Sequence, residues 1–351
     1  MILMGNVRIL ARRDSFLEKI MLTGITGFVG ERLAKVLLDS GLRVRALVRN
    51  PARLTWSHPG LEVVKGDVRE AAQVREAMEG CSRAYYLVHG LAEDSAFEHE
   101  EARAAQVFAS SCRLAGIKKI IYLGGLGDTT VSLSPHLRSR HLTGDILRIP
   151  GIPVTEFRAS IVIGRGSTSF AILSSLVRRL PFFVEPRNLK AECQPIHVDD
   201  LLSYLIADAP EGIYEIGGPD RVTYAELLLR TARASGLSRK LIPVPPLEVL
   251  ILKEAFELIC PEYSKVGGHL FESLVHPTVV THHQAVIDFP QIRPVGVDEA
   301  LRIEGGAGEE QARLLSPAHL AEVIRMLESR FDAVKVLKPH FFSFLGRFSS
   351  I

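Results

Sequence analysis

The sequence predicts an α/β protein with a doubly wound parallel sheet, followed by a smaller, mixed and mostly helical C-terminal lobe. In the first half of the 351-residue chain, apolar runs of strand length alternate with longer segments of helical period. Such alternation implies parallel βαβ units and a sheet covered by helices on both faces. From about Phe170 the pattern becomes more helical, and prolines cluster at Pro243, Pro245 and Pro246.

The first α/β unit is expected near the start of the chain. Residues 19–23 form an apolar run of strand length, and a glycine-rich turn follows it. A helix is predicted over 31–41, because Leu33, Val36 and Leu37 recur at helical spacing and Gly41 is a typical helix end. The next elements are an amphipathic helix over 93–115 and strands at 43–48, 61–65, 84–88, 119–123 and 154–158.

These elements divide the chain into four parts. An N-terminal extension covers 1–18, and the doubly wound α/β domain, a Rossmann fold, is predicted over 19–165. A substrate or cap lobe, interleaved with the Rossmann core, is predicted over 166–305. Residues 306–351 form the C-terminal part, whose helix is expected to begin at Ser316 and Pro317, an N-cap followed by a proline at the first helical position.

The C-terminal tail is rich in phenylalanine. Two cations, Lys338 and Arg347, flank its aromatic residues. Such a tail either folds back onto the body of the protein or makes a peripheral contact with a membrane surface or a partner protein. The phenylalanines are Phe341, Phe342, Phe344 and Phe348.

Composition excludes several classes of function. The chain has 42 Lys and Arg against 40 Asp and Glu, a net charge of +2, which is too balanced for binding nucleic acid through its phosphate backbone. The four cysteines lie far apart and lack zinc-ligand spacing, so we expect no metal and a reducing compartment. No apolar run approaches the roughly 18 residues of a membrane span. We therefore predict a cytoplasmic protein without a transmembrane segment.

The strongest motif is TGITGFVG over residues 23–30. Its three glycines lie between a predicted strand and a predicted helix, which is the context of a dinucleotide-binding turn. Gly24 permits a tight turn, Gly27 lets backbone amides approach a pyrophosphate, and Gly30 allows the helix to pack on the strand. The residues expected to bind the cofactor here are Gly24, Thr26, Gly27, Phe28, Val29 and Gly30. The alternative is a glycine turn without a ligand.

The end of the second strand predicts which cofactor binds. A site for NAD normally has an acidic residue there, which holds the adenosine ribose hydroxyls. This chain has Arg49 instead, with Arg53 nearby. Guanidinium groups form charge-assisted hydrogen bonds with a 2′-phosphate, so NADP(H) is favoured over NAD(H). The alternative is that the two arginines belong to a solvated surface run.

Three further strand ends should contribute to the same groove, since ligands collect at the carboxyl ends of parallel strands. Asp67 follows the third strand, where its carboxylate could accept a hydrogen bond from the adenine amino group, and Val68 is next to it. The other two strand ends contribute Val88, His89, Leu123 and Gly124. His89 is equally consistent with a simple turn residue.

With these motifs, the chain resembles an atypical or extended short-chain dehydrogenase/reductase, in the branch that includes NmrA-like and complex I accessory-subunit-like proteins. TGITGFVG resembles the cofactor loop of this family, RNPARL its arginine-bearing NADP signature, and GDV its adenine-contact segment. Three later segments of this chain, FRASIVIG, PIHVDD and YEIGGP, resemble sequence motifs of the extended family. The resemblance therefore extends over about 19–301. The resemblance implies the fold and the cofactor, but no particular substrate.

One departure from the family affects catalysis. Members use a serine after the fifth strand and a Tyr-x-x-x-Lys pair on the next helix, whose tyrosine donates a proton. Here the serine position has Gly124 and Gly125, and no tyrosine occurs between Tyr122 and Tyr204. The surviving pair is His136 and Arg140, four residues apart and on one helical face.

The candidate catalytic residues are therefore His136 and Arg140. Arg140 could hold ribose hydroxyls, but its proton is not exchangeable near pH 7. His136 is then the remaining donor, and its place at the positive end of a helix should lower its pKa below the usual ~6.5. The alternative is that both residues cap the helix or line the groove without chemistry.

The leading prediction is an NADPH-dependent oxidoreductase that acts on an unidentified small molecule bound between the two lobes. The main alternative is a non-catalytic protein in which NADP(H) serves a structural, redox-sensing or assembly role. A nucleotide-sugar epimerase or dehydratase is less favoured, because such enzymes also generally rely on the missing tyrosine.

Overall fold

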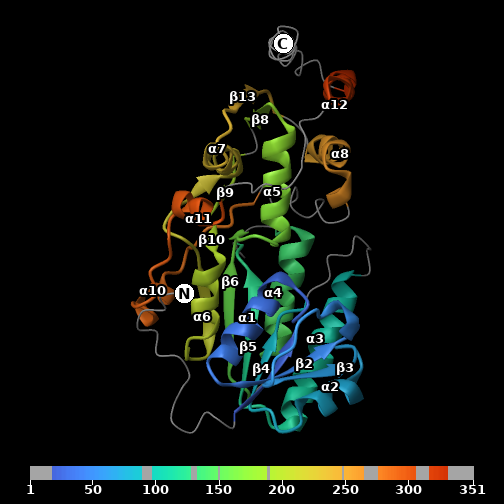
Figure 1. Ribbon diagram of the computed structural model, residues 1–351, viewed down its shortest axis with the longest axis vertical. Helices are drawn as coiled ribbons and strands as arrows, with labels where there is room; N and C mark the ends of the chain where they lie inside the picture. Colours follow the sequence, from blue (N-terminus) through green and yellow to red (C-terminus); the bar gives the residue numbers. More distant parts are fainter. Residues whose placement is uncertain are drawn as a thin grey trace.

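A parallel seven-stranded sheet forms the lower half of the molecule in Figure 1. The computed structural model describes residues 18–88, 97–127, 133–148, 151–187, 190–246, 249–264, 276–305 and 316–330. The strand order is β11-β6-β5-β4-β1-β2-β3, and every neighbouring pair is parallel. The strands are β1 (Lys19–Thr23), β2 (Arg43–Val48), β3 (Leu61–Lys65), β4 (Arg83–Tyr86), β5 (Lys119–Gly125), β6 (Val154–Ala159) and β11 (Gly212–Ile216).

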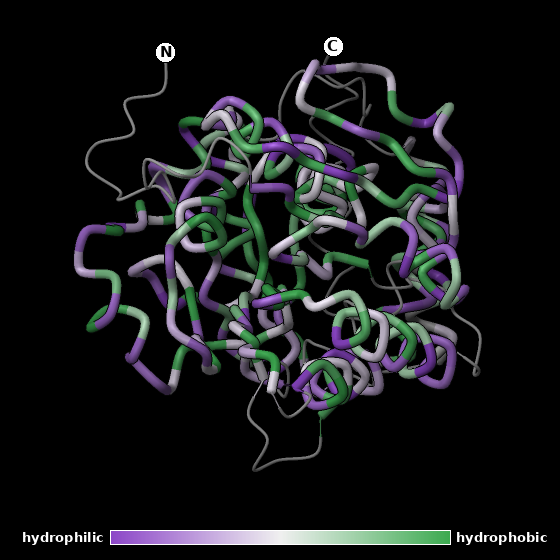
Figure 2. The backbone as a smooth tube through the Cα atoms, turned by 90° about the horizontal axis from the view of Figure 1, so that it is seen from below, coloured by the Kyte–Doolittle hydropathy of each residue, from purple (hydrophilic) through white to green (hydrophobic). Residues whose placement is uncertain are grey.

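Helices cover both faces of this sheet, and alternate residues of each strand pack against opposite helices. In β1, Ile20 and Leu22 belong to the hydrophobic core under one set of helices, whereas Met21 belongs to the core under the other. Figure 2 shows hydrophobic stretches of backbone, in green, in the middle of the molecule and many hydrophilic stretches along its outline. The helices around the sheet are α1 (Phe28–Asp39), α2 (Ala71–Met78), α3 (Phe97–Ala115), α4 (Pro135–Leu147) and α6 (Val198–Leu205).

The direction of the strand order changes at β1, which has β2 on one side and β4 on the other. The loops after these strands therefore run to opposite faces, and a crevice opens at the carboxyl edge between them. This arrangement is the Rossmann fold that the alternation of strands and helices predicts.

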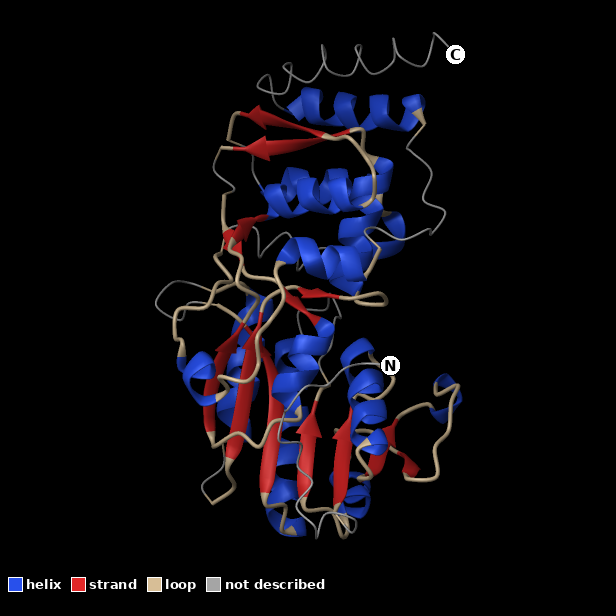
Figure 3. Ribbon diagram, turned by 60° about the vertical axis from the view of Figure 1, so that its left-hand side comes forward, coloured by secondary structure: helices blue, strands red, loops and turns tan. Residues whose placement is uncertain are grey.

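A second, smaller lobe stands above the carboxyl ends of the strands (Figure 3). It combines three two-stranded sheets with helices, as the sequence predicts for a mixed and mostly helical lobe. Its short strands are β7 (Val162–Ile163), β8 (Phe182–Pro186), β9 (Glu192–Cys193), β10 (Ile196–His197), β12 (Val222–Thr223) and β13 (Lys240–Val244). Its helices are α5 (Thr168–Arg179), α7 (Tyr224–Ala234), α8 (Val249–Ile259), η3 (Pro261–Tyr263), α11 (Val297–Ile303) and α12 (Pro317–Arg330).

The lobes are interleaved in sequence, because the chain returns from the upper lobe to add α6 and β11 to the sheet. Short η2 (Pro51–Arg53) follows β2, and α10 (Gln284–Asp288) contacts β11. The expected helix start at Ser316 is confirmed: its hydroxyl accepts a hydrogen bond from the backbone amide of His319 at 3.3 Å.

Parts of the predicted segments lie outside the described residues: 1–17 of the extension, 93–96 of the helix predicted over 93–115, 306–315, and 331–351 of the C-terminal tail with its phenylalanines. No helix within the described ranges is long and apolar enough to cross a membrane.

Replacing Leu33 by alanine should destabilise the sheet domain. Leu33 is fully buried in the core under α1, so Leu33→Ala should lower the free energy of unfolding by about 2–5 kcal/mol through lost contacts and a cavity. Leu114→Ala is the matched control, because Leu114 is 68% exposed on α3 and should tolerate the change. Urea unfolding of both variants measures the difference, and equal losses would contradict this packing.

Candidate functional site

A cleft of about 1060 Å³ opens at the carboxyl edge of the sheet, between the two lobes. Its walls come from the ends of β1, β2, β4, β5 and β6 and from the first turns of α1, α4, α5 and α7. Fourteen of the sixteen residues singled out from the sequence line it: Gly24, Thr26, Gly27, Phe28, Val29, Gly30, Arg49, Arg53, Val68, Val88, Leu123, Gly124, His136 and Arg140.

The glycine turn brings backbone against backbone at the start of α1. Gly24 has a φ of +77°, and a Cβ there would lie 2.6 Å from the carbonyl oxygen of Leu87 on the neighbouring segment. The amide of Gly27 donates to the carbonyl of Gly24 at 2.9 Å and closes the turn. A Cβ on Gly30 would overlap that same carbonyl. Side chains at these positions would therefore push α1 away from the sheet.

The first turn of α1 presents its amides to the cleft. The N-cap is Gly27, which has no side chain to occupy them. Unsatisfied amides at a helix N-terminus, together with the helix dipole, form a site for an anion such as a diphosphate. The hydroxyl of Thr23 fixes the turn from behind, since it donates to the carbonyl of Tyr85 at 3.0 Å and accepts from the amide of Leu87 at 3.1 Å.

Two arginines line the cleft where β2 ends. Arg49 follows the strand, and Arg53 lies in η2, whose start is capped by Asn50 through a 3.2 Å hydrogen bond from Ala52. Both arginines are exposed, and within the described ranges neither forms an ion pair with a carboxylate. Both guanidinium groups are thus available to an anionic ligand.

Asp67 and His89 are the two predicted residues that do not line the described cleft. The carboxylate of Asp67 is bound by Arg69, with its Oδ2 2.8 Å from Nη2, and this hydrogen bonding holds the pKa of Asp67 below its usual range. Its neighbours Gly66 and Val68 do face the cleft. His89 lies outside the described residues, so its place stays a prediction.

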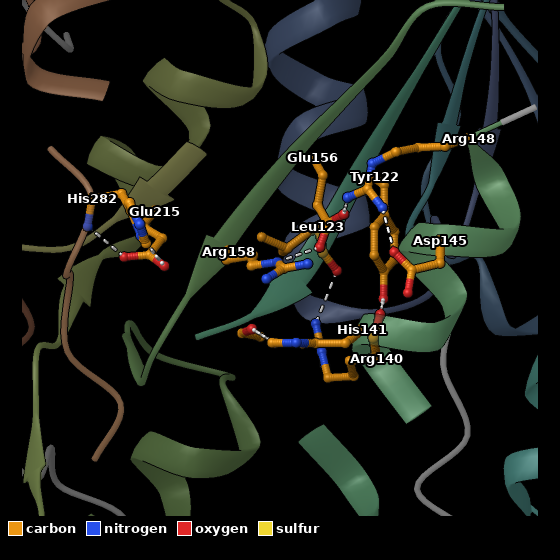
Figure 4. A network of polar contacts seen from close by, with 11 residues as sticks. Tyr122, Leu123, Arg140, His141, Asp145, Arg148, Glu156, Arg158, Glu215 and His282 are labelled. Carbon is orange, nitrogen blue, oxygen red and sulfur yellow. Dashed lines mark hydrogen bonds and ion pairs between the residues drawn. The ribbon is translucent and has the colours of Figure 1, made fainter. Parts of the chain in front are cut away.

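His136 and Arg140 lie one turn apart on α4, as the sequence predicts, and both line the cleft. Ser134 is the N-cap of α4, and its hydroxyl accepts from the amide of Leu137 at 3.3 Å. Arg140 donates through Nη2 to the carbonyl of Leu123 at 2.9 Å (Figure 4). This contact fixes the guanidinium beside the end of β5.

Glycines in β5 and α4 make room for a buried ion cluster behind the cleft (Figure 4). Glu156 of β6 is fully buried and binds Arg158 at 2.6 Å and also Arg148. A Cβ on Gly124 would lie 2.9 Å from Glu156, and one on Gly144 would collide with it. Burial raises the pKa of Glu156, while Arg158 opposes that change. Gly124 thus gives space to the side chain of Glu156.

The ring of His141 is buried next to this cluster on α4. Its Nε2 lies 3.0 Å from the carbonyl oxygen of Gly125, which requires a proton on that nitrogen. Burial and the nearby Arg158 lower the pKa of His141. The ring is therefore a neutral donor that holds the end of β5.

The sequence reasoning missed a wall rich in hydroxyl groups on the upper side of the cleft. Only Ser160 of this wall lies in a motif that the sequence singled out. The others come from α5, α7 and a loop between the two lobes, and no spacing along the chain connects them. The residues of this wall are Ser160, Ser167, Thr168, Ser169, Tyr224 and Thr278.

Comparison with known proteins agrees with this geometry. Residues 24–148 match a protein family described as NAD(P)H-binding. The ceramide reductase of Caulobacter vibrioides is 28% identical over 238 residues, which cover 64% of this chain and 73% of that protein. The (4-alkanoyl-5-oxo-2,5-dihydrofuran-3-yl)methyl phosphate reductase of Streptomyces griseus is 26% identical over 226 residues, covering 62% and 74%.

Solved structures of nucleotide-sugar enzymes share the fold. The UDP-glucose 4-epimerase of Thermotoga maritima with UDP-glucose has a TM-score of 0.61 at 15% identity, covering 82% of this chain and 97% of the epimerase. The dTDP-glucose 4,6-dehydratase of Bacillus anthracis in complex with NAD has a TM-score of 0.63 at 13% identity, covering 84% and 97%. At these identities the likeness establishes the architecture.

Gly30→Ala should disrupt the turn more than Gly27→Ala. The new Cβ at 30 meets the backbone carbonyl of Gly24, whereas the Cβ at 27 would lie 3.2 Å from it, a tight but tolerable distance. We expect Gly30→Ala to lower the melting temperature by several degrees, equivalent to about 1–3 kcal/mol of overpacking, and Gly27→Ala to lower it less. Thermal unfolding followed by circular dichroism measures both, and the reverse order would contradict the packing of α1.

Proposed function

We propose that this chain, which has a Rossmann fold and an NAD(P)H-binding segment over 24–148, is an atypical short-chain dehydrogenase/reductase and an NADPH-dependent oxidoreductase. The observation that carries the proposal is one cleft lined by the uncapped first turn of α1 and by Arg49 and Arg53, which form no ion pair with a carboxylate among the described residues. Their chemistry fits a diphosphate and a 2′-phosphate. When bound, NADPH supplies a hydride.

Different residues along the cleft bind different parts of the cofactor. Backbone amides after Gly27 bind the diphosphate, and Gly24 and Gly30 keep the turn close enough to reach it. Arg49 and Arg53 hold the 2′-phosphate and select NADPH over NADH. Val68 packs beside the adenine, while the contact of Asp67 with the adenine amino group competes with its bond to Arg69.

At the substrate end of the cleft, β5, β6 and α4 form its floor. Arg140, fixed by the carbonyl of Leu123, orients the nicotinamide ribose through its hydroxyls. His136 is one turn closer to the N-terminus of α4 and faces the same space. The relatives named as reductases support reduction of a small molecule, which binds between the lobes above this floor.

A second candidate is a non-catalytic role, in which NADP(H) binding stabilises the protein or signals the redox state. It is favoured by the sequence of α4: the resemblance to short-chain dehydrogenases implies a tyrosine and a lysine on this helix, and the chain has His136 and Arg140. Nucleotide-sugar epimerisation or dehydration, suggested by the fold neighbours, ranks third for the same reason.

Removing Arg49 should reduce the preference for NADPH. Loss of one charge-assisted hydrogen bond costs about 1.5–3 kcal/mol, so Arg49→Ala should weaken NADPH binding roughly 10- to 150-fold and leave NADH binding nearly unchanged. Arg43→Ala is the matched control, since Arg43 is exposed at the far end of β2. Trp56, the only tryptophan of the chain, lies near η2 and reports binding by fluorescence. Equal loss for both cofactors would refute the assigned role.

The role of His136 on α4 is tested by activity measurements. NADPH oxidation with a panel of aldehydes, enones and quinones tests the oxidoreductase proposal, and His136→Gln tests the histidine as a proton donor. If the histidine donates the proton, the rate of His136→Gln should fall about 10²- to 10⁴-fold, the typical loss for a general acid. An unchanged rate in His136→Gln would remove the histidine from the mechanism. A chain that binds NADPH tightly and reduces no compound in the panel would favour the non-catalytic role.

A further inference from the structure

Three hydroxyl groups from distant parts of the chain meet on the upper wall of the cleft. Ser160 directly follows β6, Thr278 lies in the loop that returns from the upper lobe, and Tyr224 is the first residue of α7. The hydroxyl oxygens of Ser160 and Thr278 are 2.7 Å apart. The three residues are separated by 54 or more positions in sequence, so only the tertiary fold brings them together.

Thr278 is held rigidly between the two lobes. Its amide donates to the carbonyl of Glu192 at 2.8 Å, and its carbonyl accepts from the amide of Gln194 at 3.0 Å. These bonds form an isolated parallel bridge between Thr278 and Cys193 of β9. Thr278 is only 4% exposed, so its hydroxyl has a fixed position beside Ser160.

The phenol of Tyr224 is the third of these hydroxyl groups. Burial raises its pKa well above the usual range, and the nearby hydroxyl of Thr278 opposes only part of that change. The phenol therefore keeps its proton throughout the neutral range. Thr223 caps α7 by accepting from Glu226 at 3.1 Å, which fixes the residue next to it at the edge of the cleft.

This wall faces the floor that carries the proposed chemistry. Ala159, the residue before Ser160, pairs with Gly125 of β5, and Gly125 packs against the side chain of Arg140. All of these residues line the same cleft. A ligand between floor and wall would contact α4 on one side and the three hydroxyls on the other.

We propose that Ser160 and Tyr224, positioned by Thr278, bind the carbonyl oxygen of the substrate, and that Tyr224 supplies its proton. The proposal rests on the proposed function and gives the chain a tyrosine donor from α7 in place of the one missing from α4. Bound NADPH would supply a hydride to the carbonyl carbon, and the electron pair of the C=O π bond would move to oxygen. That oxygen takes the phenolic proton of Tyr224, and the phenolate regains a proton from water in the open cleft.

The first test measures binding without turnover. Protein saturated with NADP⁺ has no hydride to give, so calorimetric titration with phenanthrene-9,10-quinone reports on the oxygen site alone. Losing one hydrogen bond worth about 1 kcal/mol should weaken binding about fivefold in Tyr224→Phe and in Thr278→Val. Thr278→Ser keeps the hydroxyl and should restore wild-type affinity.

Matched controls lie outside the cleft. Tyr214 donates to Asp288 at 3.1 Å on β11, and Thr155 donates to the carbonyl of Pro210 at 2.7 Å. Tyr214→Phe and Thr155→Val remove the same groups as the test variants and should leave quinone affinity unchanged. Wild-type affinity in both test variants, or no quinone binding by the wild-type protein, would overturn the oxygen site.

The second test follows NADPH oxidation by the same quinone in single turnovers. Tyr224→Phe should slow the reaction about 10²- to 10⁴-fold and change its pH profile. Weaker quinone binding in Tyr224→Phe at an unchanged rate would support the oxygen site and overturn proton donation. A wild-type chain that binds the quinone through these hydroxyls and oxidises no NADPH would overturn the proposed function, and proton donation with it, while supporting the oxygen site.

Discussion

The close approach of α1 to the turn after β1 is the contact on which the rest of the cleft depends. Gly30 packs directly on the carbonyl of Gly24, and Gly24 packs on the carbonyl of Leu87, so β1, β4 and α1 meet without intervening side chains. This contact sets the direction in which the first turn of α1 presents its amides. The same junction is where the strand order changes direction, so the crevice between the two halves of the sheet opens above these amides.

A buried charge cluster shapes the other end of the cleft. Glu156 lies under β5 and α4, where Gly124 and Gly144 leave the volume that its carboxylate occupies. Burying a carboxylate is costly unless cations pair with it, and Arg148 and Arg158 do so here. In this chain the end of β5 is therefore shaped by internal packing around the carboxylate of Glu156.

The upper lobe contributes a polar wall to the cleft. Its loops carry Thr278 and Tyr224 to the rim of the cleft, opposite His136 and Arg140. A polar wall held by backbone bonds from β9 and facing a charged floor suits a ligand with an oxygen group at one end. The joint between the lobes thus has the geometry of a substrate site, and the glycine turn has the geometry of a cofactor site.

The sequence alone determined the parallel sheet with its covering helices and the glycine turn at the start of α1, and it predicted the nucleotide side of the cleft. These features follow from local patterns: strand and helix periods, three glycines at fixed spacing, and Arg49 and Arg53 at a strand end. Tertiary structure alone decided that Arg69 binds the carboxylate of Asp67, that Gly124 accommodates Glu156, and that Ser160, Thr278 and Tyr224 meet. Such contacts depend on which distant segments pack together, and the spacing of residues along one segment carries no information about that packing.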